Sequence, residues 1–251
     1  MLLLHGLGGD REQALRLIPV ADRHTRIAAE MPGHGDTSIE DGEPITFAHF
    51  AELTADLLDH LVAAGRIPSE PIPVVGVSMG AGVALALAAA RRDLVQRLVL
   101  IRPSWLVRTP AANLAPFQAI AELLHEFEAE AAERAFAASA MWAAIEREAP
   151  AMAGSLLAQF RRPEARKRSR VLAEIPRSLP LPDREAYRGI TADTLVLVAP
   201  QDPVHPLELG LRLAEYLPHA RVGRLPRKLQ DPTAHEAALR RAVHSYLDEQ
   251  T

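Results

Sequence analysis

The stretch from Ile72 to Ala90, IPVVGVSMGAGVALALAAA, constrains the fold of this chain more than any other segment. It passes from a short apolar run typical of a strand, through a glycine-flanked serine, into an Ala- and Leu-rich run with high helix propensity. In such a tight strand-turn-helix connection the apical residue has a strained backbone, so the positions two before and two after it must be small. Gly76 and Gly80 meet this demand, which predicts that Ser78 stands clear of the sheet edge.

A serine at this apex is a candidate nucleophile. The helix that begins after Ser78 directs backbone N–H groups and the positive end of its dipole toward any negative charge formed there. Two glycines around a serine also occur in ordinary structural turns, and that is the alternative interpretation. The strand before and the helix after this pentapeptide favour the nucleophile.

A second glycine-rich loop opens the chain. Leu2 to Leu4 is predicted to be a buried strand, and it is followed by His5-Gly6-Leu7-Gly8-Gly9-Asp10 and a helix expected from about Arg11 to Ile18. The glycines allow backbone N–H groups to converge on one point beside a helix N-terminus. A simple glycine-rich turn is the alternative, and the presence of the serine motif weakens it.

The two motifs together resemble the α/β-hydrolase family. The resemblance implies an α/β fold, with a mostly parallel sheet of about six strands and helices on both faces. It also implies an oxyanion hole made by the backbone N–H groups of Leu7 and Met79. The Pro-Gly-His-Gly run that contains His34 is similar to a stretch in which the family's histidine is structural, so we assign His34 no chemistry.

The resemblance also implies two further strands ahead of Leu2, which this sequence does not contain. Either this sequence begins late relative to the family pattern, or the sheet is shortened, and in the second case the strand near Arg26 to Ala29 is an exposed edge. An exposed edge strand offers a place for self-association, so a homodimer is one expectation from the sequence.

Long amphipathic patterns without strands extend from Arg102 to about Gly189. In the resembled family a helical cap lies at this place, which predicts a cap over residues 104–189 inserted in a core of residues 1–103 and 190–251. The large apolar side chains of the insertion suggest an apolar pocket, with Trp105, Trp142 and Phe160 as candidate substrate contacts. For any single one of them, packing between cap and core is the simpler expectation.

A candidate acid follows the strand predicted from Thr194 to Ala199. The strand ends in Pro200-Gln201-Asp202-Pro203-Val204-His205-Pro206, which looks like the acid-bearing loop of the family. Asp202 occupies the position of the acid, which orients a histidine and stabilises its cation. A helix N-terminal or turn carboxylate is the alternative. His205 is expected to belong to the pocket wall rather than to act as the base.

The catalytic base is where the sequence departs from the family pattern. The family's base lies in a Gly-His loop after the last strand, whereas the corresponding loop here reads Pro226-Arg227-Lys228-Leu229-Gln230 and is shorter. His235, in the first turn of the closing helix, is the favoured replacement, and a helix N-terminus would keep its imidazole neutral. His244 lies two turns deeper, and nothing around Lys228 argues for the lowered pKa that a lysine base needs.

These residues predict a serine hydrolase for an ester-like or other acyl small molecule, with a Ser78-His235-Asp202 triad and a covalent acyl-enzyme. If no histidine serves as base, the alternative is a degenerate member of the fold that acts as a small-molecule binding or accessory protein. The scaffold alone does not select the substrate.

Composition limits the partners of this 251-residue chain. A formal net charge of −4 gives no reason to expect nucleic acid or an anionic membrane as a partner. The absence of cysteine excludes disulfides and thiolate metal sites, and the ten histidines show no paired ligand spacing, so we expect no metal or organic cofactor. No apolar run has the length of a membrane span or a signal-peptide core, which favours a cytoplasmic protein with a small apolar acyl substrate.

Overall fold

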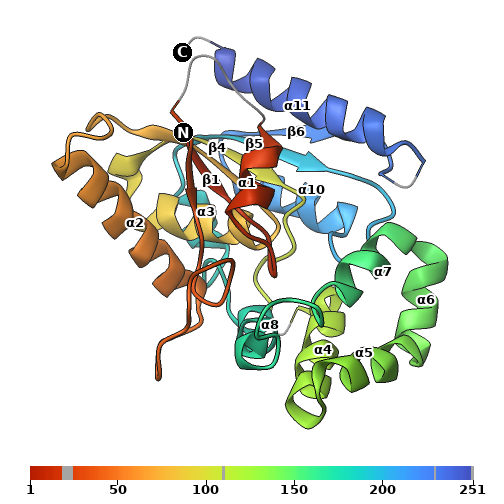
Figure 1. Cartoon of the computed structure of the whole chain (residues 1–251). Helices are drawn as coiled ribbons and strands as arrows, with labels where there is room; N and C mark the ends of the chain where they lie inside the picture. The colour runs from red at the N-terminus through yellow and green to blue at the C-terminus, as the bar shows by residue number, and fades with distance from the viewer. Residues whose placement is uncertain (19–24, 109–110, 229, 250–251) are drawn as a thin grey trace.

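The structure is a computed structural model that describes residues 1–18, 25–108, 111–228 and 230–249. Within these residues, six parallel strands form one sheet in the order β2-β1-β3-β4-β5-β6 (Figure 1). The strands are β1 (Leu2–Leu4), β2 (Ile27–Ala29), β3 (Ile72–Val77), β4 (Val95–Ile101), β5 (Asp193–Val198) and β6 (Ala220–Arg224). The predicted α/β architecture is confirmed, and β2 lies at one edge of the sheet.

Helices cover both faces of the sheet because successive strand residues point to opposite faces. On one face, Leu3, Val75 and Val99 pack with residues of α1 (Arg11–Leu17) and α11 (Pro232–Asp248). On the other face, the alternate strand positions pack against the remaining core helices. These are α2 (Phe47–Ala63), α3 (Met79–Ala90) and α10 (Leu207–Tyr216).

The chain between β4 and β5 forms an inserted helical region. Its helices are α4 (Ala115–Glu126), α5 (Ala129–Ala137), α6 (Ala140–Glu148), α7 (Pro150–Leu157), α8 (Arg170–Glu174) and α9 (Arg184–Arg188). Figure 1 shows α4 to α7 as a group that projects beyond the end of the sheet where the strands finish. No helix in the described part of the chain is both long enough and apolar enough to span a lipid bilayer.

The turn between β3 and α3 depends on two glycines, as the sequence predicts. A Cβ on Gly76 would lie 2.2 Å from the carbonyl oxygen of Gly80, and a Cβ on Gly80 would lie 2.3 Å from the carbonyl oxygen of Leu4. Both clashes are with backbone, which cannot move away as a flexible side chain can. The close approach of α3 to β1 and β3 therefore requires glycine at both positions.

We expect Gly80→Ala to lower the free energy of unfolding by roughly 1–3 kcal/mol, because the added methyl group overpacks a backbone contact. Gly154→Ala is the matched control. A methyl group on Gly154 in α7 meets no atom within 4 Å, and alanine there should stabilise the helix by about 0.5–1 kcal/mol. Urea denaturation of both variants measures the difference, and equal effects would contradict the packing argument.

Candidate active site

Ser78 occupies the apex of the turn between β3 and α3. Its backbone angles, φ 53° and ψ −112°, lie in the left-handed region that non-glycine residues rarely adopt. The Ser78 amide donates to the carbonyl of Ile101 at 2.9 Å, which ties this strained residue to β4. The side chain faces a pocket, and its Oγ lies 3.4 Å from the Oγ of the buried Ser104. Strain of this kind concentrates at functional sites.

The glycine-rich loop after β1 lies beside Ser78. The backbone N–H of Gly6 donates to the side-chain oxygen of Gln13 at 2.7 Å. The Asp10 carboxylate accepts from the backbone N–H of Gln13 at 2.7 Å and thereby caps the N-terminus of α1. Leu7 lines the same pocket as Ser78. Met79 is the first residue of α3, where backbone N–H groups have no acceptor within the helix. The role of the Leu7 and Met79 amides as an oxyanion hole stays a prediction.

Asp202 is held in the loop after β5 by four interactions. Its Oδ1 accepts from the amides of Val204 at 3.2 Å and His205 at 3.1 Å. Its Oδ2 accepts from His205 Nδ1 at 2.7 Å and from the Arg102 guanidinium at 3.2 Å. Burial on its own raises the pKa of this carboxyl, but the attraction of His205 and Arg102 outweighs burial and lowers the pKa well below the usual range. Asp202 is therefore an anion at neutral pH.

His205 has the tautomer that a general base needs. Because the Asp202 carboxylate only accepts, Nδ1 of His205 carries the proton of their 2.7 Å hydrogen bond and Nε2 has a free lone pair. The ring is buried, and Nε2 has no hydrogen-bond partner among the described residues. Burial lowers the pKa of His205, and Arg102 lowers it further, while Asp202 opposes both. The imidazole is therefore neutral at neutral pH.

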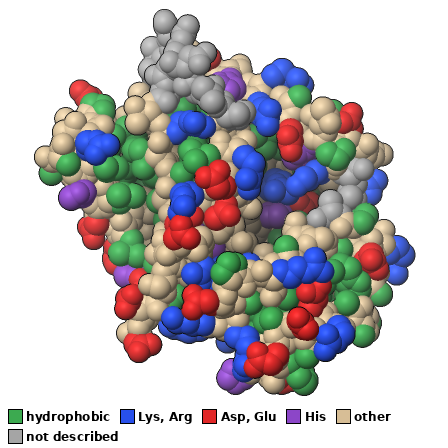
Figure 2. Space-filling model, viewed as in Figure 1, with side chains coloured by type: hydrophobic (Ala, Val, Ile, Leu, Met, Phe, Trp, Pro, Cys, Tyr) green, Lys and Arg blue, Asp and Glu red, His purple; other side chains and the backbone are tan. Residues whose placement is uncertain are grey.

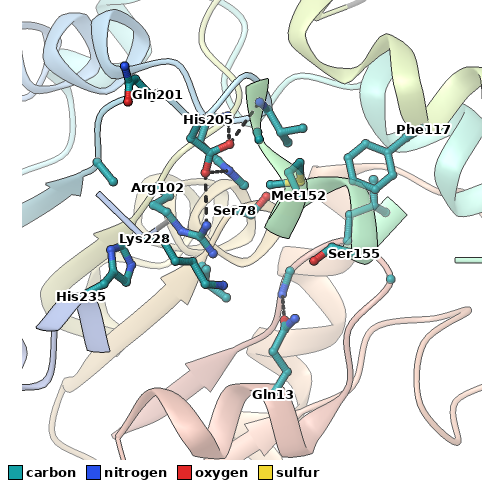
Figure 3. A pocket seen from close by; sticks show the side chains of 18 of the residues that line it. Gln13, Ser78, Arg102, Phe117, Met152, Ser155, Gln201, His205, Lys228 and His235 are labelled. Carbon is teal, nitrogen blue, oxygen red and sulfur yellow. Dashed lines mark hydrogen bonds and ion pairs between the residues drawn. The ribbon is translucent and has the colours of Figure 1, made fainter. Parts of the chain in front are cut away.

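His235 has a different partner from the one that the sequence analysis assigned to it. In the first turn of α11, its Nδ1 donates to the carbonyl of Pro226 at 2.7 Å, and burial lowers its pKa. His235 does line the pocket of Ser78, but the histidine bonded to Asp202 is His205. In Figure 3, His235 lies toward the edge of the view, on the far side of Lys228 from Ser78.

The local fold of the acid loop explains why Asp202 and His205 pair. The Asp202 side chain accepts from the amides two and three residues ahead, which folds the loop back on itself. This turn brings the ring of His205 onto the carboxylate. The short segment after β6 supplies no histidine there, and its Leu229 lies outside the described residues.

The aromatic residues predicted to contact substrate are buried elsewhere. Trp105 packs edge-on against Phe47 and donates its indole N–H to the Ile175 carbonyl at 3.2 Å. Trp142 and Phe160 both pack against Phe136 inside the inserted region. None of the three predicted contacts is among the described residues that line the pocket, because Trp105 is buried against the core and Trp142 and Phe160 are buried within the insertion.

His34 is buried beside His5, with ring centroids 4.7 Å apart. Its Nδ1 donates to the Pro32 carbonyl at 3.0 Å, and burial lowers the pKa of the ring well below its ordinary value. His34 is not among the described residues lining the pocket of Ser78. This placement agrees with the structural role expected for it.

The pocket around Ser78 has a volume of about 180 Å³ and is shared by the core and the insertion. The insertion contributes Phe117, Ala149, Met152, Ser155 and Gln159. The core contributes several polar side chains, of which sequence reasoning missed Gln13, Arg102 and Arg227. Among the described residues, no group of three or more His, Cys, Asp or Glu side chains is arranged to hold a metal ion.

The chain belongs to the alpha/beta hydrolase family, whose model matches residues 1–244. Over 104 residues it is 36% identical to the dihydrolipoyllysine-residue acetyltransferase component of the acetoin cleaving system of Cupriavidus necator. That match covers 41% of this chain and 26% of the other protein, so the chain matches about a quarter of that relative's length.

Two solved structures show the same fold over nearly the whole chain. The enol-lactonase of Burkholderia xenovorans LB400 is 21% identical, with a TM-score of 0.72 over 99% of this chain and 90% of the other. A thermophilic esterase of Thermogutta terrifontis is 20% identical, with a TM-score of 0.70 over 97% of this chain and 89% of the other. At sequence identities this low, the similarity to these two structures shows a shared fold only.

Proposed function

We propose that the protein is a serine hydrolase that cleaves ester-like acyl substrates, with Ser78 as nucleophile, His205 as general base and Asp202 as the acid that orients it. The observation that carries this proposal is the Asp202–His205 hydrogen bond of 2.7 Å in the pocket that Ser78 lines. His205 takes the role that the sequence analysis gave to His235, since the structure pairs Asp202 with His205. Family membership and the structural neighbours named as lactonase and esterase support the reaction class.

The reaction follows from the roles of these groups. Ser78 Oγ attacks the acyl carbonyl carbon while Nε2 of His205 takes the hydroxyl proton, and the Leu7 and Met79 amides stabilise the oxyanion. The C–O bond of the ester then breaks, and His205 returns the proton to the departing alcohol. Water attacks the resulting acyl-enzyme by the same route, releasing the acid and restoring Ser78. Asp202 accepts the hydrogen bond from Nδ1–H of His205 and stabilises the imidazolium in both halves of the reaction.

The proposal requires that Ser78 Oγ and His205 Nε2 come into hydrogen-bond contact when the substrate binds. In the structure, Ser78 Oγ lies 3.4 Å from Ser104 Oγ, and His205 Nε2 has no hydrogen-bond partner among the described residues. Catalytic hydrogen bonds are often long without substrate and shorten in the reacting complex. A rotation about χ1 of Ser78, away from Ser104, is the change that the proposal requires.

We also propose that residues 104–189 act as the cap of the active site. Phe117 of α4, Met152 of α7 and Gln159 line the pocket of Ser78. Side chains at this position would define the length of the acyl group and exclude water from the acyl-enzyme. These residues line the pocket, whereas the larger aromatic side chains Trp105, Trp142 and Phe160 do not.

A fluorophosphonate probe tests the nucleophile. We expect the wild type to gain one adduct at Ser78, detected by intact mass and peptide mapping, and Ser78→Ala to gain none. Ser104→Ala is the matched control, because it removes the neighbouring buried hydroxyl 3.4 Å away and should leave labelling at Ser78. A folded wild type that takes no label would overturn the hydrolase and favour a binding or accessory protein.

A further inference from the structure

The pocket of Ser78 is unusually rich in positive charge for a chain whose formal net charge is −4. Among the described residues that line it, the cationic side chains are Arg102, Arg227 and Lys228, and the carboxylate is Asp202. In the space-filling view, Lys and Arg side chains gather beside a hollow on this face, and histidine atoms are visible within it (Figure 2). Neutral acyl chains need no such concentration of cations.

Asp202 does not neutralise these cations. Its carboxylate already accepts from His205 and from one nitrogen of Arg102, so the single negative charge is shared. Arg102 Nε is buried and has no hydrogen-bond partner in the described part of the chain, and the same holds for Nε of Arg227. A buried donor without an acceptor costs free energy, and a positive charge beside it without a full counter-charge adds to that cost, so a bound anion at the exposed part of the guanidinium would stabilise the site.

Arg102 is placed in this pocket by a strained backbone. It directly follows β4 with φ 47°, a left-handed conformation that a non-glycine residue adopts at a cost, and its amide donates to the Leu197 carbonyl at 2.8 Å. The conformation directs the guanidinium toward Asp202 at the carboxyl end of the sheet. Strain that persists at such a place is consistent with a binding role.

Lys228 lies beside Arg102 in the pocket (Figure 3). Lys228 is exposed on one side, and the partial burial of its ammonium group lowers the pKa of Lys228. The positive charge of Arg102 lowers this pKa further, while Asp202 and Glu236 oppose both effects. Neither Lys228 nor Arg227 has an ion-pair partner within 4.0 Å among the described residues. These two cations occupy the short segment after β6, where the resembled family has its histidine loop.

We propose, resting on the proposed hydrolase function, that the substrate is a small acyl compound that carries a second, anionic group, a carboxylate, which Arg102, Lys228 and Arg227 bind. The guanidinium fork of an arginine matches the two oxygens of a carboxylate, and a lysine adds a compact charge. The anion would neutralise the excess positive charge of the pocket and relieve the repulsion between Arg102 and Lys228. This replaces the expectation of a purely apolar acyl substrate.

Matched pairs of esters test the proposal. The first pair compares p-nitrophenyl hemiglutarate with p-nitrophenyl valerate and places the charge on the acyl side. The second compares acetoxyacetate with propyl acetate, by pH-stat, and places the charge on the alcohol side. We expect kcat/KM for the charged member of one pair to exceed that of its neutral partner by about tenfold or more, a preference that decreases as NaCl is added.

The variant Lys228→Gln should lower this charged-to-neutral ratio by about fivefold to tenfold, since it removes one charge from the anion site. Lys167→Gln is the matched control, because Lys167 is exposed and its side chain lies 3.8 Å from Glu164, outside the described lining of the pocket. A neutral preference in both pairs, or an equal ratio in both variants, would overturn the anion site.

A binding readout separates this proposal from the hydrolase itself. Glutarate at millimolar concentration should raise the Tm of the wild type, whereas glutaramide should not, and Lys228→Gln should reduce the shift. If the protein takes no fluorophosphonate label but glutarate stabilises it, the anion site stands and the hydrolase falls. If the protein is labelled but shows neither stabilisation nor charged-ester preference, the anion site falls and the hydrolase stands.

Discussion

Replacing His205 by alanine is expected to lower kcat/KM for a p-nitrophenyl ester by about 10²- to 10⁴-fold, because the hydroxyl of Ser78 then has no neutral imidazole to take its proton. The residual activity comes from substrate binding and the oxyanion hole. Steady-state kinetics, together with a thermal melt showing that the variant is folded, measure the loss. The prediction depends on His205 being the histidine that Asp202 orients.

The matched control is His235→Ala, which removes a second buried histidine from the same pocket. His235 donates to the Pro226 carbonyl, so its loss leaves one carbonyl without that partner and should affect stability more than the chemical step. A large loss in His235→Ala with near-normal activity in His205→Ala would assign the base to His235 and contradict our proposal.

The fold could be predicted because its determinants are local. The serine motif requires a strand, a tight turn and a helix, and the clashes that a Cβ would cause at Gly76 and Gly80 are the physical form of that requirement. The apolar run of β3 points alternately to the two faces of the sheet, with Val74 on one face and Val75 on the other, so both faces must be covered by helices. Each step needs only residues that are close in the sequence.

The proposed base was harder to predict from the sequence because the pairing of Asp202 with His205 depends on the fold of the acid loop. The run Asp202-Pro203-Val204-His205 carries the signal, a histidine three residues after the acid. Its significance appears only when the Asp202 side chain accepts from the amides of Val204 and His205 and turns the imidazole toward itself. The position of the family's usual histidine instead predicts His235 as the base, and His235 donates to a backbone carbonyl.

The positive charge of the pocket also could not be predicted from the sequence. Arg102 and Lys228 are 126 residues apart in the chain, and parallel strands bring them together at the carboxyl edge of the sheet. The size of their apolar side chains makes Trp105 and Trp142 candidate pocket residues in the sequence. Large apolar side chains gain free energy when they are removed from water, and the structure buries Trp105 against Phe47 of α2 and Trp142 against Phe136 of the insertion.

The variant Asp202→Asn is expected to lower kcat/KM by about 10³- to 10⁴-fold, although the side chain keeps its shape. The amide can donate to Nδ1 of His205, which would place the imidazole proton on Nε2 and leave no lone pair for the proton of Ser78. The measurement is kcat/KM as a function of pH. Asp231→Asn, at the N-cap of α11, is the isosteric control and should have little effect because asparagine caps helices as well as aspartate does.

The pH profile distinguishes a catalytic from a merely structural role of Asp202. In the wild type, kcat/KM should increase with pH as His205 loses its proton and then reach a plateau, with the midpoint below the ordinary histidine pKa because burial lowers the pKa of the ring. The Asp202 charge opposes that lowering, so its removal in Asp202→Asn should move the acid limb to still lower pH while the plateau falls. If the plateau of kcat/KM falls in Asp202→Asn while the midpoint of the acid limb stays at the wild-type pH, Asp202 only supports the loop and His205 is not the titrating base.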